Sequence, residues 1–249
     1  MKFGDGSREM FESAKDRHPD PRSMKDKVAH EVSEIEPVQN WLKDRAELMI
    51  KRSGVEDVVE EFSDEEKIRI VDVGGGKGHM MQELIKSNPD KEIKTVGIDL
   101  SDYASKKVSK SNEGEKMDSV FGDGENMPIK DKSVEMATAY FTFQELDDDQ
   151  QNEILEQMRE MIKDNGRIVL VDEILQEEKT EGIIAHSKNI LLNLKVSKFN
   201  LRSEDEWKKF FEDNELEVES SVIFGDDEEN KKEQFISFVL KKTEEKDEK

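Results

Sequence analysis

The strongest candidate for binding chemistry is a glycine-rich segment, Asp72-Val73-Gly74-Gly75-Gly76-Lys77-Gly78. Glycine lets the backbone turn sharply and approach a ligand closely, and the amides at the start of a following helix attract polar groups. A phosphate-binding P-loop would need Ser or Thr after Gly-Lys, but Gly78 follows Lys77. A dinucleotide fingerprint would need a small residue at the position of His79. The spacing therefore excludes a P-loop and fits a dinucleotide site poorly.

A second acidic residue, Asp99, ends the apolar run that includes Val96 and Ile98. It lies 21 residues after Gly78, close to the roughly 20-residue offset at which a carboxylate meets the ribose of an adenine nucleotide. A carboxylate can accept hydrogen bonds from both ribose hydroxyls. An Asp at a strand end also commonly caps a helix, but the preceding glycine segment favours the ligand-binding role.

Asp72 followed by glycines at 74, 76 and 78 resembles the first motif of class I S-adenosylmethionine-dependent methyltransferases. Asp99, the segment 121–129 and Asp164-Asn165-Gly166-Arg167 follow in the order typical of that family, although the last replaces a frequent Lys-Pro-Gly-Gly. The resemblance runs from Lys67 to Leu240 and points to the broad group acting on small molecules and quinone-type substrates. It implies S-adenosylmethionine as cofactor, bound by Asp72, Gly74, Gly75, Gly76, Gly78, Asp99, Leu100, Asp123, Gly124 and Tyr140.

The catalytic residues are not identified by any motif. Methyl transfer needs a general base only if the acceptor enters protonated, and the candidates are Tyr140, Glu145 and His186. The sequence Ala139-Tyr140-Phe141-Thr142 replaces the Asn/Asp-Pro-Pro-aromatic motif of many amino-methylating enzymes, which argues against adenine-amino methylation. No spacing of carboxylates and histidines indicates a metal site. A non-catalytic cofactor-binding or regulatory protein, a methyltransferase of a protein or RNA, and a dinucleotide-dependent oxidoreductase are the alternatives.

The elements that position these residues alternate between strand and helix. Such alternation predicts a doubly wound α/β fold with a mostly parallel sheet, because parallel neighbours need crossover connections. The family resemblance further implies that the sheet has seven strands and that its final strand is antiparallel. Helices are expected from Glu36, over 55–62, from 79 to before Pro89, over 103–109, from Asp147 to a stop at Asn165-Gly166, over 180–199 and after Ser203. The strands are expected at 68–73, 94–99, 118–121, 133–141, 167–171, 216–224 and 234–240.

The chain is expected to divide into an N-terminal arm and helical cap over residues 1–60, a cofactor-binding domain over 61–242 and a charged tail over 243–249. Apolar residues in the cap and in 180–199, such as Trp41, Leu42 and Leu191, predict an enclosed pocket for a small-molecule acceptor. Alternatively, these apolar residues serve only internal packing or a homodimer contact.

The amino-acid composition indicates which classes of partner and which cellular location to expect. The net charge of −22 would repel a phosphate backbone, so we expect no broad contact with nucleic acid. We interpret the acidity as a solubility feature rather than as a surface for a basic partner. The absence of cysteine excludes disulfides, thiolate zinc sites and a cysteine nucleophile. No run approaches the roughly 18 apolar residues of a membrane span, so we expect a cytoplasmic protein.

Overall fold

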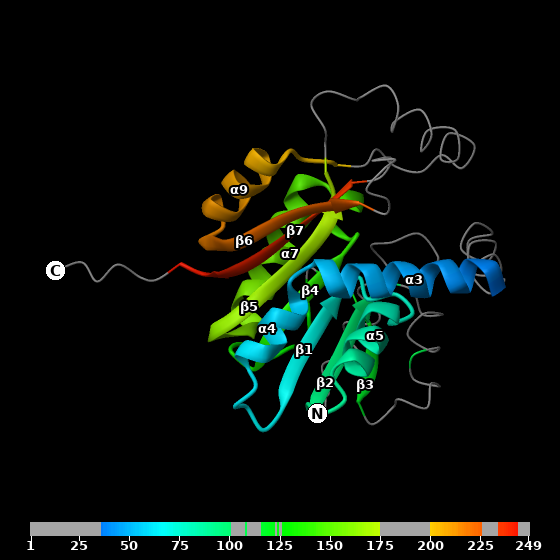
Figure 1. Cartoon of the computed structure of the whole chain (residues 1–249). Coiled ribbons are helices and arrows are strands. Elements are labelled where there is room, and N and C mark those ends of the chain that lie inside the picture. Colours follow the sequence, from blue (N-terminus) through cyan, green and yellow to red (C-terminus); the bar gives the residue numbers. More distant parts are fainter. Residues whose placement is uncertain are drawn as a thin grey trace.

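A seven-stranded sheet organises the chain, in the order β3-β2-β1-β4-β5-β7-β6 (Figure 1). The computed structural model describes residues 36–100, 108, 116–122, 124, 126–174, 200–225 and 234–243. Strands β1 to β5 run parallel, whereas β7 is antiparallel to both β5 and β6. The expected α/β fold is therefore confirmed. The strands span β1 Ile68–Val73, β2 Ile93–Asp99, β3 Met117–Phe121, β4 Val134–Tyr140, β5 Ile162–Glu173, β6 Leu216–Gly225 and β7 Gln234–Lys242.

Helices cover both faces of this sheet, because successive strand residues point to opposite sides. Ile70 of β1 packs in a buried cluster with Met49, whereas its neighbour Val71 packs in a second cluster with Leu155 and Trp207. The first face is covered by α3 Glu36–Arg52, α4 Val55–Glu61 and α5 His79–Ser87, and the second by α7 Asp148–Met161 and α9 Glu204–Asp213 (Figure 1). A short 3-10 helix, η1 Phe143–Glu145, follows β4.

Two helices begin with capping boxes that satisfy otherwise unpaired backbone amides. The side chain of Ser203 accepts from the amide of Glu206, and the Glu206 side chain accepts in return from the Ser203 amide. Asp147 and Gln150 form the same reciprocal pair at the start of α7. These caps fix the start of α7, which packs against β4 and β5, and the start of α9, which packs against β6.

The expected helix stop at Asn165-Gly166 is wrong. Helix α7 ends at Met161, and Ile162 already pairs with Val134 as the first residue of β5. The register then shifts, so that Arg167 pairs with Met136 and the intervening residues form a bulge. Gly166 lies in this bulge and has no left-handed backbone conformation. The strand is therefore longer at both ends than the apolar run 167–171 suggested.

The N-terminal helices α3 and α4 belong to the same core as the sheet. Met49, Ile50, Val55 and Val59 are all buried within the cluster that contains Ile70. Residues 36–60 thus contribute to the core of the sheet, and both the helical cap and the division of the chain at residue 60 stay predictions. The expected helices at 103–109 and 180–199 lie outside the described residues, apart from Val108. No helix in the described ranges is both long and apolar enough to cross a membrane.

Candidate functional site

The glycine segment forms a tight loop between the end of β1 and the start of α5. Gly74, Gly76 and Gly78 have φ angles of 73°, 51° and 75°, a left-handed conformation that side chains disfavour. The loop is closed by a hydrogen bond of 2.8 Å from the amide of Gly78 to the carbonyl of Gly75. The spacing of glycines at 74, 76 and 78 therefore matches three backbone positions that need glycine.

Two of these glycines differ in what surrounds them. A Cβ atom on Gly74 would lie 2.2 Å from Oγ1 of Thr142, whose hydroxyl also donates a hydrogen bond of 3.0 Å to the carbonyl of Val73. A Cβ atom on Gly76 would meet nothing closer than a carbonyl oxygen at 4.0 Å. Gly74 thus locks the loop against the end of β4, while Gly76 borders open space that a ligand can enter.

Asp72 lies directly before the loop and is 2% exposed. Its Oδ1 accepts a hydrogen bond of 2.7 Å from the hydroxyl of Thr138 on β4. Burial raises the pKa of the Asp72 carboxyl to about 7, the Thr138 hydrogen bond opposes this, and the negative charge of Asp99 adds to it. Asp72 is therefore a buried carboxyl whose ionised form would be stabilised by a cationic ligand.

Asp99 ends β2 on the other side of the loop. Its Oδ2 accepts a hydrogen bond of 2.8 Å from the amide of Gly76, which holds the carboxylate beside the glycine segment. The next residue, Leu100, has 37% of its surface exposed. The pair thus places a carboxylate and an exposed apolar side chain together at the carboxyl edge of the sheet, and their role in cofactor binding stays a prediction.

The remaining expected cofactor residues are only partly described. Gly124 lies against the core, since a Cβ atom there would lie 2.9 Å from Ile154 of α7 and 3.4 Å from Val73. Asp123 and the candidate base His186 lie outside the described residues. Tyr140 is 7% exposed and packs in the cluster beneath α3 and α4. Burial raises the pKa of its hydroxyl, so Tyr140 is a poor general base.

The end of β4 carries two further features. Phe141 has a φ angle of 57°, a strained conformation for an aromatic residue and one that is frequent at functional sites. Glu145, at the end of η1, is exposed to solvent, yet protein atoms around its carboxyl raise its pKa, and the charge of Asp99 raises it further. Of the two loop carboxyl groups, only that of Asp99 affects the pKa of Glu145, and Tyr140 is buried away from solvent.

Helix α3 brings a cation to the same strand end, which the sequence analysis missed. The guanidinium of Arg45 lies 4.7 Å from the ring centroid of Phe141 and 4.6 Å from that of Phe235. It also lies 5.0 Å from the ring of Trp41, a side chain that is 52% exposed. The sequence analysis expected Trp41 to line an enclosed pocket, whereas here its ring faces Arg45 and is half exposed.

Asp172 is a second residue that sequence reasoning did not single out. It lies near the end of β5, is 1% exposed, and neither of its carboxyl oxygens has a hydrogen-bond partner within the described part of the chain. Burial raises its pKa well above the usual range, and the charges of Glu173 and Glu145 add to the effect. The only sequence signal was an acidic residue directly after the buried run 168–171.

Comparison with known proteins agrees with this geometry. A family model described as a methyltransferase domain matches residues 70–166, which include the glycine loop, Asp99 and β4. The sheet order and the antiparallel β7 are those of class I methyltransferases. Residues 70–166 thus match a methyltransferase domain, and the sheet around them has the class I S-adenosylmethionine-dependent methyltransferase fold.

A relative of this methyltransferase domain is des-methyl DIF-1 methyltransferase A of Dictyostelium discoideum. It is 24% identical over 163 residues, which cover 63% of this chain and 44% of that protein. The chain spans less than half the length of the curated relatives it matches.

Two solved structures share the fold of the methyltransferase domain. Mitomycin 7-O-methyltransferase MmcR has a TM-score of 0.59 and 18% identity, and the match covers 84% of this chain and 59% of that one. LepI, solved in complex with S-adenosylmethionine, has a TM-score of 0.62 and 18% identity, with 78% and 47% coverage. At these identities the likeness shows the fold alone.

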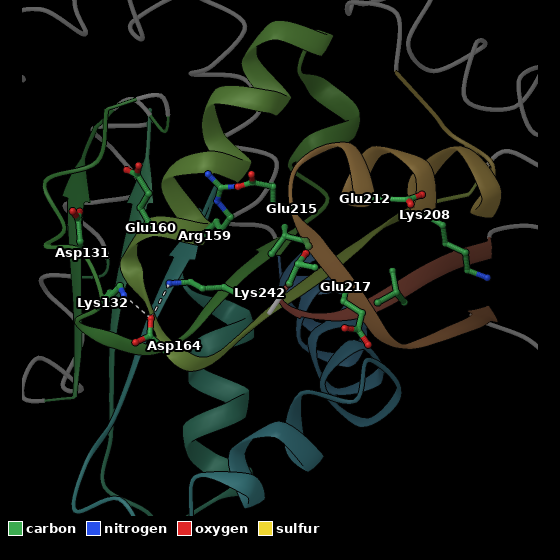
Figure 2. Close-up of a pocket in the computed structure, with 13 residues that line it drawn as sticks. Asp131, Lys132, Arg159, Glu160, Asp164, Lys208, Glu212, Glu215, Glu217 and Lys242 are labelled. Atoms are coloured by element: carbon green, nitrogen blue, oxygen red, sulfur yellow. Dashed lines mark hydrogen bonds and ion pairs between the residues drawn. The ribbon is translucent and has the colours of Figure 1, made fainter. Parts of the chain in front are cut away.

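A cavity of about 1210 Å³ lies at the opposite end of the methyltransferase domain (Figure 2). Its lining includes Lys132 before β4, Asp164 near the start of β5 and Lys242 at the end of β7. These positions lie at the amino ends of the parallel strands, whereas the glycine loop lies at their carboxyl ends. Lys132 and Lys242 lie 2.7 and 4.0 Å from Asp164. The cavity is therefore separate from the site built around Asp72 and Asp99.

The methyltransferase domain shows no metal-binding group in the ranges that the structure describes. No three His, Asp or Glu side chains there are placed to hold a metal ion together.

Proposed function

We propose that the chain transfers the methyl group of S-adenosylmethionine to a small-molecule acceptor. The observation that carries this proposal is the position of two carboxyl groups, Asp72 and Asp99, on either side of a loop with three left-handed glycines. The loop has no Ser or Thr after Lys77 for phosphate binding, and S-adenosylmethionine contains no phosphate.

The described residues fit the parts of this cofactor. A ligand cation beside Asp72 would stabilise the ionised carboxyl, and S-adenosylmethionine has an ammonium group and a sulfonium centre. The carboxylate of Asp99 suits two ribose hydroxyls, and the exposed side chain of Leu100 offers an apolar surface for the adenine ring. Asp123, Gly124 and Tyr140 stay predicted cofactor residues. When bound, the cofactor supplies an electrophilic methyl group on sulfur.

The protein contributes position and exclusion of water. The hydroxyl of Thr142 donates a hydrogen bond to the carbonyl of Val73 and so holds the glycine loop against the end of β4. At the same strand end the guanidinium of Arg45, from α3, lies over the ring of Phe141. Holding the acceptor atom about 3 to 3.5 Å from the methyl carbon, in line with the carbon–sulfur bond, accounts for much of the rate in such transfers. An enclosed apolar site adds to this because it removes competing water.

The small-molecule acceptor is supported by the names of des-methyl DIF-1 methyltransferase A and mitomycin 7-O-methyltransferase. It is also supported by the net charge of −22, which disfavours RNA. The alternatives are a protein or RNA acceptor and a cofactor-binding protein without turnover. A homodimer and a cytoplasmic location also stay proposals.

The test is calorimetric titration of the full chain with S-adenosylmethionine, S-adenosylhomocysteine and NAD. We expect binding of the first two with micromolar-class affinity, about −8 kcal/mol, and none of NAD. Binding of NAD alone would replace the proposal by an oxidoreductase. Formation of S-adenosylhomocysteine with pooled small metabolites, but not with RNA or protein fractions, separates the acceptor classes. Cofactor binding with no turnover in any fraction would favour the non-catalytic alternative.

A further inference from the structure

A buried glutamine on α7 is the centre of a polar network that reaches the end of β4. Gln151 is 0% exposed, although its neighbours on the same helix face, Ile154 and Leu155, are apolar. Its Nε2 donates hydrogen bonds of 2.6 Å to the carbonyl of Phe143 and of 3.4 Å to that of Leu146. These carbonyls belong to the first residue of η1 and to the residue that follows η1. Gln151 therefore holds both ends of this short turn.

Arg202 contacts the other side of the Gln151 amide. Its Nη1 donates to Oε1 of Gln151, and its Nη2 donates to the carboxylate of Asp148 at 2.8 Å. The same guanidinium lies 4.5 Å from the ring centroid of Phe210 and 5.0 Å from that of Trp207, both on α9. Because an arginine can only donate, the oxygen of Gln151 has to face it, which turns the amide nitrogen towards η1.

Asn200 adds a second link between the segment before α9 and η1. Its backbone amide donates at 2.8 Å to the carbonyl of Gln144, and its side chain donates at 2.8 Å to Asp148. The side-chain oxygen of Gln144 accepts in turn from the amide of Glu173 on β5 at 3.1 Å. Buried polar groups cost free energy unless they are hydrogen-bonded, so a network that satisfies them in one arrangement favours that arrangement. The network therefore fixes η1 from α7, from β5 and from residues 200–202.

Thr142 joins η1 to the glycine loop. Its carbonyl accepts from the amide of Glu145 at 3.2 Å, so its backbone is part of the first turn of η1. Its hydroxyl donates at 3.0 Å to the carbonyl of Val73, directly before the loop. On the other side, the amide of Gly74 donates at 2.8 Å to the carbonyl of Ile98 on β2. The start of the loop is therefore held between β2 and η1, and a displacement of η1 would move one of these two supports.

We propose that Gln151 and Arg202 are positioning residues for the cofactor: they hold η1 and, through Thr142, keep the glycine loop in the conformation that binds S-adenosylmethionine. This inference rests on the proposed methyltransferase function. The apparent affinity of a site falls in proportion to the fraction of molecules in the binding conformation. A loop that is already held in that conformation therefore binds more tightly, and Gln151 needs no contact with the cofactor to have this effect.

The experiment measures S-adenosylhomocysteine binding to the full chain by calorimetry, and thermal unfolding of each variant checks the fold. Gln151→Met keeps the length of the side chain but removes its donor and its acceptor, and it should raise the dissociation constant about tenfold or more. Gln151→Glu keeps the acceptor for Arg202 but loses the donor to Phe143, so it should weaken binding as well. The matched control is Met158→Ala, a fully buried position two turns further along α7, which should lower the melting temperature and leave the affinity unchanged.

A double-mutant cycle tests whether the effect passes through Thr142. Thr142→Val removes the hydroxyl with little change in shape and should weaken binding, whereas Thr142→Ser keeps the hydroxyl and should bind almost as the wild type does. The double variant Gln151→Met/Thr142→Val should lose no more affinity than the weaker-binding single variant. Additive losses, or wild-type affinity in both Gln151 variants, would overturn the inference while the proposed function stands. A wild-type protein that does not bind S-adenosylhomocysteine would overturn both.

Discussion

The hydroxyl oxygen of Thr142 occupies the position that a side chain on Gly74 would need, 2.2 Å from an ideal Cβ atom. Residue 74 also has a left-handed backbone, with φ of 73°. Loop conformation and close approach to β4 therefore impose glycine at this position independently.

Gly74→Ala should consequently lower the free energy of unfolding and abolish cofactor binding. The left-handed backbone alone costs about 1 to 2 kcal/mol for a residue with a Cβ atom, and the collision with Thr142 adds to it. Gly76→Ala is the matched control, because it has the same type of backbone but open space around the added carbon. Urea unfolding of both variants measures the difference. Equal destabilisation would show that the Thr142 contact has no effect.

Asp99→Asn should weaken S-adenosylhomocysteine binding while the protein stays folded. Hydrogen bonds to a charged group contribute about 1.5 to 3 kcal/mol, so the dissociation constant should rise roughly 10- to 150-fold. Calorimetry gives the affinity and circular dichroism checks the fold. Asp118→Asn on the neighbouring strand β3 is the control and should bind normally. An unchanged affinity in Asp99→Asn would leave Asp99 as only a structural partner of the Gly76 amide.

The pKa of Asp72, raised to about 7, predicts a dependence of stability on pH. Between the ordinary value of 3.8 and about 7, the folded protein retains a proton that the unfolded chain has lost. The free energy of unfolding should therefore fall as pH rises through this window, by an amount on the order of 4 kcal/mol, and level off above it. Asp72→Asn should lack this component. Unfolding curves at pH 4 to 8 for both proteins provide the measurement, and parallel curves would contradict it.

Cofactor affinity should change in the opposite direction. A cationic ligand binds the ionised form of Asp72, so affinity for S-adenosylmethionine should increase as pH rises towards 7 and then become constant. Below that value each pH unit should cost up to about tenfold. Calorimetry in a series of buffers gives both the affinity and the proton released. Affinity that is independent of pH would place the ligand cation away from Asp72.

Tyr140→Phe separates the role of the ring from that of the hydroxyl. The hydroxyl is buried and has no hydrogen-bond partner in the described part of the chain, so its removal should leave stability unchanged or raise it by up to about 1 kcal/mol. Cofactor binding and turnover should persist if only the ring contributes. Thermal unfolding and a turnover assay measure the two effects. A large loss of turnover would assign the hydroxyl a role in the reaction.

The sequence predicted those parts of the site that depend on local backbone rules. The glycine spacing at 74, 76 and 78 and the strand-end Asp99 could be found because left-handed turns and strand ends have clear residue signatures. The residue at which α7 ends could not be predicted in this way. Its last turn is replaced by pairing of Ile162 with Val134, a contact between residues 28 positions apart that a local stop signal does not reveal.

Asp172 and Arg45 were missed for a related reason. An acid after a buried strand looks the same in sequence whether or not a partner faces it, and only the packing of η1 shows that Asp172 has none there. Arg45 occupies an ordinary helix position, and its three aromatic neighbours come from α3, the end of β4 and the start of β7. Such convergence depends on tertiary structure.

The place of β7 in the sheet also has a consequence for how the protein is made. Residues 234–242 follow β6 in the sequence, yet they lie between β5 and β6 and pair with both. While a ribosome is still synthesising the chain, β5 therefore has an open edge and β6 has no neighbour in the sheet. Unpaired strand edges favour association between chains. The nascent protein should thus depend on chaperones, or on rapid completion of synthesis, until β7 has left the exit tunnel.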